Sequence, residues 1–102
     1  MLKQFKPSDL VVEVVNGEPY KYYPLGEHVV MAPGVCGGRP TFKYTRLEVE
    51  IVLVDLKAGY SIDDVIVDFQ RSNLTKEAVQ EAIDLAQEAF LTSSKSALPA
   101  AV

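Results

Sequence analysis

Three helix signals in a row, between Arg46 and Phe90, constrain the fold of this chain more than any other feature. Within each, apolar residues recur at the three- and four-residue spacing that places them on one side of an α-helix. Two short turns separate the three signals. This layout predicts a small tri-helical, helix-turn-helix-like domain, with helices over about 48–58, 62–69 and 76–91.

The third predicted helix has its charges in order. At about 100° per residue, one line of its surface is apolar and is expected to face the core: Val79, Ile83, Ala86 and Phe90. The opposite line is an unbroken acid stripe: Glu77, Glu81, Asp84 and Glu88. In a DNA reader this helix would enter the major groove and carry four carboxylates toward phosphates. The fold class therefore suggests DNA reading, whereas the charge argues against it.

The first predicted helix is apolar on nearly every side. One stripe consists of Val49, Val52, Leu53 and Leu56, and a second of Ile51, Val54 and Ala58. A helix with this pattern is expected to sit between two layers.

The helix boundaries carry capping signals. Gly59 is expected to end the first helix, and Ser61 with Asp64 forms a capping-box pair for the second. Thr75 is the expected N-cap of the third helix, and the preceding Leu74 is placed to pack against Val79 as a hydrophobic staple.

Ahead of the helices, residues 10–15 and 20–23 are rich in β-branched and aromatic types, with Asn16-Gly17 between them. This pattern predicts a β-hairpin with a type I′ turn, and 28–32 is expected to add a short strand. The predicted cross-strand pairs are Val15–Glu18, Val14–Pro19, Glu13–Tyr20, Val12–Lys21 and Val11–Tyr22. Because Pro19 lacks an N–H, its strand is expected to lie at a sheet edge on that side.

Both faces of the predicted hairpin are largely apolar. One carries Val11, Val15, Tyr20 and Tyr22, and the other Leu10, Val12, Val14 and Tyr23. A single helical domain covers only one of them, so the other is expected to meet a second protein chain. The alternative is that the tyrosines leave one face half exposed, since their ring edges tolerate water.

The segment from Pro33 to Arg46 is dense in glycine and proline at first and then basic. Its cations are Arg39, Lys43 and Arg46, and an extended conformation would place Arg39 and Lys43 on one side. The glycine pair matches no phosphate-binding fingerprint, which favours a turn-forming role.

Length and composition bound the function. With 102 residues, 48% of them hydrophobic, the chain has the make-up of one globular domain. A formal net charge of −4 disfavours non-specific binding to nucleic acid or anionic membranes. No run is long and apolar enough to span a bilayer and no signal peptide is evident, so a cytoplasmic protein is expected.

Cys36 and His28 are the sole residues of their types. They exclude an internal disulfide and a closed zinc site built from the usual ligands. They could form a nucleophile and its base, but no third group is positioned by the sequence. We therefore expect a buried small cysteine and a surface or capped imidazole, with no cofactor, no metal and no enzymatic activity.

A set of motifs in fixed order resembles a bacterial domain-of-unknown-function family, number 433. The motifs are Pro33-Gly34-Val35-Cys36-Gly37-Gly38-Arg39-Pro40, Thr45-Arg46 before a helix, Ala58-Gly59-Tyr60-Ser61, and Leu74-Thr75-Lys76-Glu77-Ala78-Val79. The resemblance covers roughly 28–90 and implies a homeodomain-like fold, an antitoxin role beside a PIN-like ribonuclease toxin, and DNA binding. This chain departs from the family with Tyr44 at the first position of a Gly-Thr-Arg triplet and with Phe69-Gln70 where a tyrosine-proline often stands.

The predicted fold class is α+β, mainly α, with an N-terminal hairpin and short strand followed by the tri-helical domain. We divide the chain into a hairpin arm at 1–27, a tri-helical domain with the basic loop at 28–91 and a flexible tail at 92–102. The first functional hypothesis is an antitoxin-like protein that masks a basic ribonuclease, with these contact residues: Val11, Tyr20, Tyr22, Tyr23, Glu77, Glu81, Asp84 and Glu88. The alternative for the acids is a merely solvated helix face.

The second hypothesis is a helix-turn-helix transcriptional regulator. Lys76, Gln80 and Gln87 would read bases, and Arg39, Lys43 and Arg46 would hold phosphates. A homodimer joined through the hairpins would be required to supply enough contacts.

Overall fold

The computed structural model describes residues 4–95, 97 and 99. A short 3₁₀ turn, η1 (Pro7–Asp9), precedes four antiparallel strands in the order β1-β2-β3-β4. The strands are β1 (Val11–Val15), β2 (Glu18–Pro24), β3 (Val29–Met31) and β4 (Thr41–Phe42), with the 3₁₀ turn η2 (Cys36–Gly38) between the last two. Three helices and a 3₁₀ turn follow: α1 (Val49–Lys57), α2 (Ile62–Asp68), η3 (Gln70–Ser72) and α3 (Lys76–Lys95). The predicted α+β fold, mainly α, is confirmed.

The hairpin has the predicted register. Asn16 and Gly17 have φ angles of 52° and 79°, as a type I′ turn requires. All the predicted pairs are present, from Val15 opposite Glu18 to Val11 opposite Tyr22. The turn is a local sequence signal, and its two-residue length sets the register of all the strand pairs of the hairpin.

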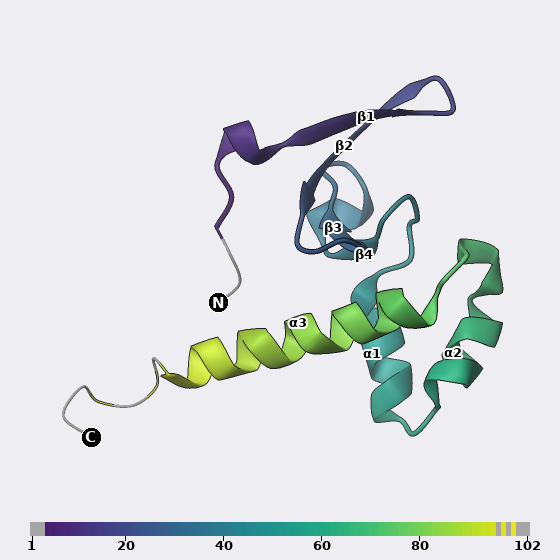
Figure 1. Cartoon of the computed structure of the whole chain (residues 1–102), viewed down its shortest axis with the longest axis vertical. Coiled ribbons are helices and arrows are strands. Elements are labelled where there is room, and N and C mark those ends of the chain that lie inside the picture. The colour runs from purple at the N-terminus through teal and green to yellow at the C-terminus, as the bar shows by residue number, and fades with distance from the viewer. Residues whose placement is uncertain (1–3, 96, 98, 100–102) are drawn as a thin grey trace.

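The hairpin projects from the body as an arm (Figure 1). β2 pairs with β3 only through Tyr23 and Pro24, so most of its length has β1 as its single partner among the described residues. The Cα radius of gyration is 15.3 Å, against about 13 Å for a compact domain of this length. Among the described strands, Pro19 has no partner on the side away from β1, so the edge position expected for this part of β2 is present.

The two predicted N-caps form, whereas the C-cap of α1 is Ala58, one residue before the predicted Gly59. The Ser61 hydroxyl accepts from the Asp64 N–H at 3.0 Å, and the Asp64 carboxylate accepts from the Ser61 N–H at the same distance. At the start of α3, the Thr75 hydroxyl accepts from the Ala78 N–H at 3.2 Å. Leu74 and Val79 are both buried in the same cluster, as a hydrophobic staple requires.

The main core lies where the three helices meet β3 and β4. Its fully buried side chains come from different elements: Val29, Val52, Val65 and Val79. Along α3 the buried line is Ala78, Val79 and Ala82, and Ala86 is exposed at an apolar hollow beside Val29 and Val49. The prediction that Phe90 faces the core is wrong. Phe90 is 70% exposed, whereas its neighbour Ala89 lines an apolar hollow with Leu25 and Leu53, so the side of α3 that faces the body does not include Phe90. Beyond this point α3 projects past α1 and α2 (Figure 1).

Helix α1 differs from the prediction on one side. Val49 and Val52 are buried in the core, and Leu53 and Leu56 pack against it. The second apolar stripe is uncovered: Ile51 is 44% exposed and Val54 56% exposed. The expected second layer is therefore missing from the described part of the chain.

The C-terminal end of α3 also lies beyond its predicted limit. The helix continues to Lys95, so residues 92–95, expected to begin a flexible tail, are helical. Most of the remaining tail lies outside the described residues.

Candidate functional site

Three of the four predicted stripe acids form an exposed surface on α3. Glu77, Asp84 and Glu88 are exposed, and we call these three residues the acid face. The Gln80 side chain donates to the Asp84 carboxylate at 3.0 Å, one helical turn away. Beside Glu77 and Asp84 lies an open hollow of about 610 Å³, whose other walls include Glu27, His28 and Lys76. Glu77 and Asp84 of the acid face therefore line this open hollow, and Glu88 lines a second one.

Glu81, the fourth stripe residue, does not face solvent freely. Its carboxylate accepts hydrogen bonds from the backbone N–H groups of Glu27, His28 and Val29, at 2.5, 2.6 and 2.9 Å. The prediction of an unbroken outward stripe is wrong at this position. The carboxylate instead joins α3 to the turn between β2 and β3, where main-chain donors converge.

Gly26 has no side chain, and the Glu81 carboxylate occupies the space where a Cβ would lie. A Cβ at Gly26 would lie 2.3 Å from Glu81 Oε1 and 2.6 Å from its Cδ. The glycine is required here for close approach and not for a left-handed backbone, since it has no positive φ.

The cations expected to hold phosphates are largely engaged by carboxylates. Arg39 donates to Glu48 at 2.5 Å, a contact that raises the pKa of Arg39. The Lys43 ammonium lies 3.4 Å from the Glu13 carboxylate. Arg46 is exposed and, among the described residues, pairs with no carboxylate. One of the three predicted phosphate contacts is thus left unpaired.

The basic segment is not extended along its length. Thr41 and Phe42 form β4 and are buried, but Tyr44 has a φ of +68° in the left-handed region. The regular alternation of sides breaks at Tyr44, so Lys43 and Tyr44 both reach the hairpin. This φ also gives a physical reason for the glycine that stands here in the resembling family.

The side chains expected to read bases are spread along α3. Lys76 pairs with Asp63 at 3.0 Å, and Gln80 donates to Asp84. Gln87 is exposed beside a second hollow, lined also by Glu88 and Lys95. The flank expected to contact DNA is therefore interleaved with carboxylates.

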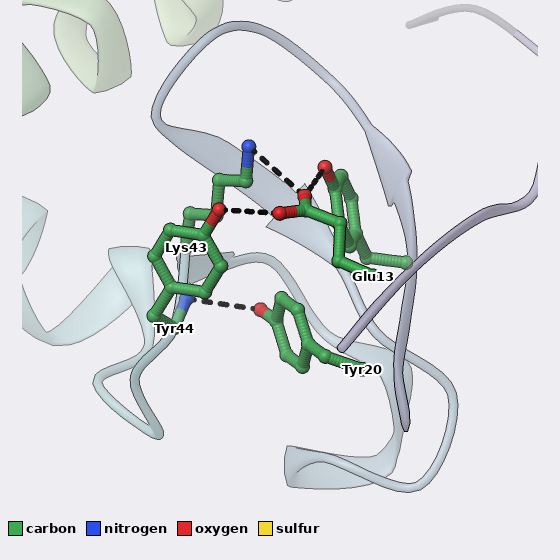
Figure 2. A network of polar contacts seen from close by, with 5 residues as sticks. Glu13, Tyr20, Lys43 and Tyr44 are labelled. Carbon is green, nitrogen blue, oxygen red and sulfur yellow. Dashed lines mark hydrogen bonds and ion pairs between the residues drawn. The ribbon is translucent and has the colours of Figure 1, made fainter. Parts of the chain in front are cut away.

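A polar cluster under the hairpin went unpredicted (Figure 2). The Glu13 carboxylate accepts from the hydroxyls of Tyr22 and Tyr44, the latter at 2.7 Å. The Tyr44 N–H donates to the Tyr20 hydroxyl at 3.0 Å, and the Lys43 ammonium lies over the Tyr22 and Tyr44 rings. The cluster fastens the arm to the loop before α1. Glu13 could have been found as the single acid in a strand of four valines, opposite Tyr20 in the predicted register.

The hydrogen bonds of this cluster shift the pKa values of Glu13, Tyr22 and Lys43. The Tyr22 hydroxyl, followed by that of Tyr44, lowers the pKa of the Glu13 carboxyl. The same bond raises the pKa of Tyr22, and the Tyr22 hydroxyl also raises the pKa of Lys43. The arrangement stabilises an ionised carboxylate beside an ammonium.

The aromatic residues predicted to contact a partner protein pack mostly against other residues of this chain. Tyr22 is 5% exposed, in a small cluster with Val30 and Ala32 that Val11 and Tyr20 pack against. Tyr23 stacks near the Phe5 ring, with centroids 5.3 Å apart. The uncovered side of the hairpin carries Val12 and Val14 instead.

Cys36 and His28 take separate structural roles. The Cys36 thiol is half-buried, not buried as predicted, and donates to the Arg46 carbonyl at 3.3 Å. The backbone N–H of His28 donates to the Glu81 carboxylate. Within the described ranges, no three His, Cys, Asp or Glu side chains are grouped to hold a metal ion. None of the helices described is long and apolar enough to cross a membrane.

Comparison with known proteins gives one match. Residues 29–86, more than half of the chain, match the family model described as "Protein of unknown function (DUF433)". The predicted resemblance is confirmed, and the hairpin arm lies outside the match. No curated protein and no solved structure matches the chain.

Proposed function

We propose that this chain, which belongs to the DUF433 family, is a non-enzymatic, antitoxin-like protein that masks a basic ribonuclease-type toxin with the acid face of α3. The observation that carries the proposal is the exposure of Glu77, Asp84 and Glu88 along one helix, where Glu77 and Asp84 line an open hollow together with Glu27. A ribonuclease that binds RNA presents cations to its polyanionic substrate. A negative helix laid on that surface competes with RNA for the same charges.

The distribution of cations supports a protein partner over DNA. Lys76 and Lys43 each have a carboxylate within 3.0–3.4 Å, and Arg39 pairs with Glu48. DNA binding would need these cations to face phosphates while the acid face is kept away from them. Complementary potential also speeds encounter with a basic protein, by an amount that falls as salt is raised.

The test uses a purified PIN-like ribonuclease encoded next to the gene for this chain. Glu77→Lys/Glu88→Lys should weaken its binding and inhibition by at least about tenfold at low salt, because it reverses two charges on the acid face. Glu18→Lys/Asp68→Lys is the matched control, since it reverses two exposed acids elsewhere and changes the net charge equally.

Equal inhibition by both double variants would refute masking by α3, and the absence of any such neighbouring ribonuclease would count against the antitoxin role. Retardation of the chain's own promoter DNA at low salt, with no ribonuclease bound, would favour the transcriptional regulator instead.

A further inference from the structure

The two long edges of the hairpin arm differ in how they are protected against further strands. Val14 lies opposite Pro19 and Val12 opposite Lys21, in pairs whose backbone groups point out of the hairpin. On the β2 side, Pro19 has no N–H to donate and Lys21 brings a charge, and both features discourage the addition of a strand. On the β1 side, both positions are valines. We call the outward backbone groups of Val12 and Val14 the β1 edge.

The β1 edge has no partner within the described part of the chain. β1 is the first strand in the order β1-β2-β3-β4, and among the described strands it pairs with β2 alone. No further backbone hydrogen bond between described residues involves Val12 or Val14. Their side chains are 56% and 78% exposed. An apolar strand with free N–H and C=O groups is a template for pairing with another strand.

We propose that the β1 edge pairs with the β1 edge of a second copy of this chain, antiparallel about a two-fold axis at Val12. Val12 then exchanges hydrogen bonds with Val12 of the second copy, and the Val14 N–H donates to the Leu10 carbonyl across the axis. The result is a continuous sheet in the order β2-β1-β1-β2. Pairing of this kind is independent of the proposed function, and it joins two hairpins through an edge and not through a face.

Glu13 selects this register among the possible ones. An axis at Glu13 would set Glu13 of the two copies directly opposite each other, and an axis at Val11 would set Glu13 opposite Asp9. Like charges placed opposite each other in a sheet destabilise the pairing. An axis closer to the turn would oppose Val12 with Asn16, whose φ of 52° ends the extended strand. With the axis at Val12, Glu13 lies opposite Val11.

The other charges near the paired edges do not oppose the pairing. The Glu13 carboxylate has the Lys43 ammonium of its own copy 3.4 Å away. The charged residues of β2, Glu18 and Lys21, are separated from their counterparts by both β1 strands. That separation is about 14 Å at the usual strand spacing, which exceeds the screening length of about 8 Å at physiological salt. In this register Asp9 lies opposite a valine.

A second copy is the occupant that the strand itself favours. β1 is apolar apart from Glu13, and each copy presents the same free donors and acceptors, which two-fold antiparallel pairing brings together. After pairing, the sheet ends on both sides in the protected β2 edge, so association stops at two copies. β1 also lies at the end of the sheet away from β4, and the arm projects from the helices (Figure 1), which leaves space for the second arm.

Sedimentation equilibrium of the whole chain, from about 10 µM to about 1 mM, tests the pairing. Val12→Pro removes the donor at the axis but suits the hairpin, because position 12, like position 19, falls at an outward pair. Val12→Ala keeps the donor and shortens the side chain. Lys21→Pro is the matched control, since it places the same ring at the same cross-strand pair on the other edge. Circular dichroism checks that all the variants fold.

We expect a wild-type dimer with no larger species. Val12→Pro should raise its dissociation constant at least about tenfold, because each copy loses a donor and gains an obstructing ring. Val12→Ala should raise it less than about threefold, and Lys21→Pro should leave it unchanged. A wild type that is still monomeric at about 1 mM would overturn the proposal. Equal weakening by the two prolines, or by both substitutions of Val12, would do the same.

Amide hydrogen exchange of the wild type gives a second readout that needs no substitution. The N–H groups of Val12 and Lys21 belong to one cross-strand pair and point to opposite edges. In the dimer, the Val12 N–H should exchange at least about tenfold more slowly than the Lys21 N–H, after correction for intrinsic rates. Equal exchange at the two positions would mean that any dimer is joined elsewhere, and the pairing of the β1 edge would then be wrong.

Discussion

Replacing Glu81 tests how the arm is joined to the helices. In Glu81→Ala three backbone N–H groups of 27–29 lose a charged acceptor that they contact at 2.5–2.9 Å. A hydrogen bond to a charged group is worth about 1.5–3 kcal/mol. Glu81 is half buried, so water replaces part of this, and we expect a total loss of about 2–3 kcal/mol in the free energy of unfolding.

Gly26 supplies a matched second perturbation. In Gly26→Ala the new Cβ would lie 2.3 Å from Glu81 Oε1, so the carboxylate must move and give up part of its bonds. We expect a destabilisation that approaches that of Glu81→Ala. In a chain that already carries Glu81→Ala, the same substitution should cost less than about 0.5 kcal/mol, since the obstructing atoms are gone.

The measurement is urea unfolding at pH 7, followed by circular dichroism, for both single variants and the double variant. The expected coupling between the two sites is about 2 kcal/mol, with the double variant within about 0.5 kcal/mol of Glu81→Ala. Glu77→Ala is the control, as an exposed acid on the same helix, and should change stability by less than about 0.5 kcal/mol. Additive single effects would refute the reasoning, because they would mean that the carboxylate does not occupy the space beside Gly26.

Three further predictions concern the arm and the core, each measured by chemical unfolding. Tyr44→Gly should be about 1 kcal/mol more stable than Tyr44→Ala, because both remove the same contacts but only glycine adopts a φ of +68° without strain; equal stabilities would contradict this. The depressed pKa of Glu13 means that its contribution is present above the unfolded value of 4.5 and is lost as pH falls through the lower folded value. Glu13→Gln should therefore flatten the decline in urea midpoint below about pH 4.5, and an unchanged profile would argue against an ionised Glu13 in the cluster. Thr41→Val should stabilise the protein by about 1 kcal/mol, since the buried Thr41 hydroxyl has no hydrogen-bond partner in the described structure; a loss of stability would indicate that the hydroxyl is satisfied.

Local signals account for what the sequence predicts correctly. Asn16-Gly17 determines the hairpin register, and the Ser61 box and Thr75 mark two helix starts within a few residues of the groups that they bond. The helix starts, the hairpin pairs and the fold class follow from interactions of this short range.

Long-range contacts account for what the sequence does not predict. A helical wheel places Glu81 opposite the predicted core line, but it cannot show that backbone donors more than 50 positions earlier approach that side. Phe90 fits the helical period of Val79, yet the side of α3 that packs is the one with Ala78, Ala82 and Ala89, which leaves Phe90 exposed. Alternation along the basic segment assumed an extended chain, and the left-handed Tyr44 removes that assumption.

The hydrogen bonds that the Glu81 carboxylate accepts from the turn before β3 come from backbone N–H groups. Every residue except proline has a backbone N–H, so these bonds do not depend on which side chains the turn carries. The exception is position 26, where the carboxylate leaves room only for glycine. The family match begins at residue 29, the last of the three residues whose N–H groups donate to Glu81. A different N-terminal segment joined ahead of a glycine at this position would be anchored by the same three hydrogen bonds.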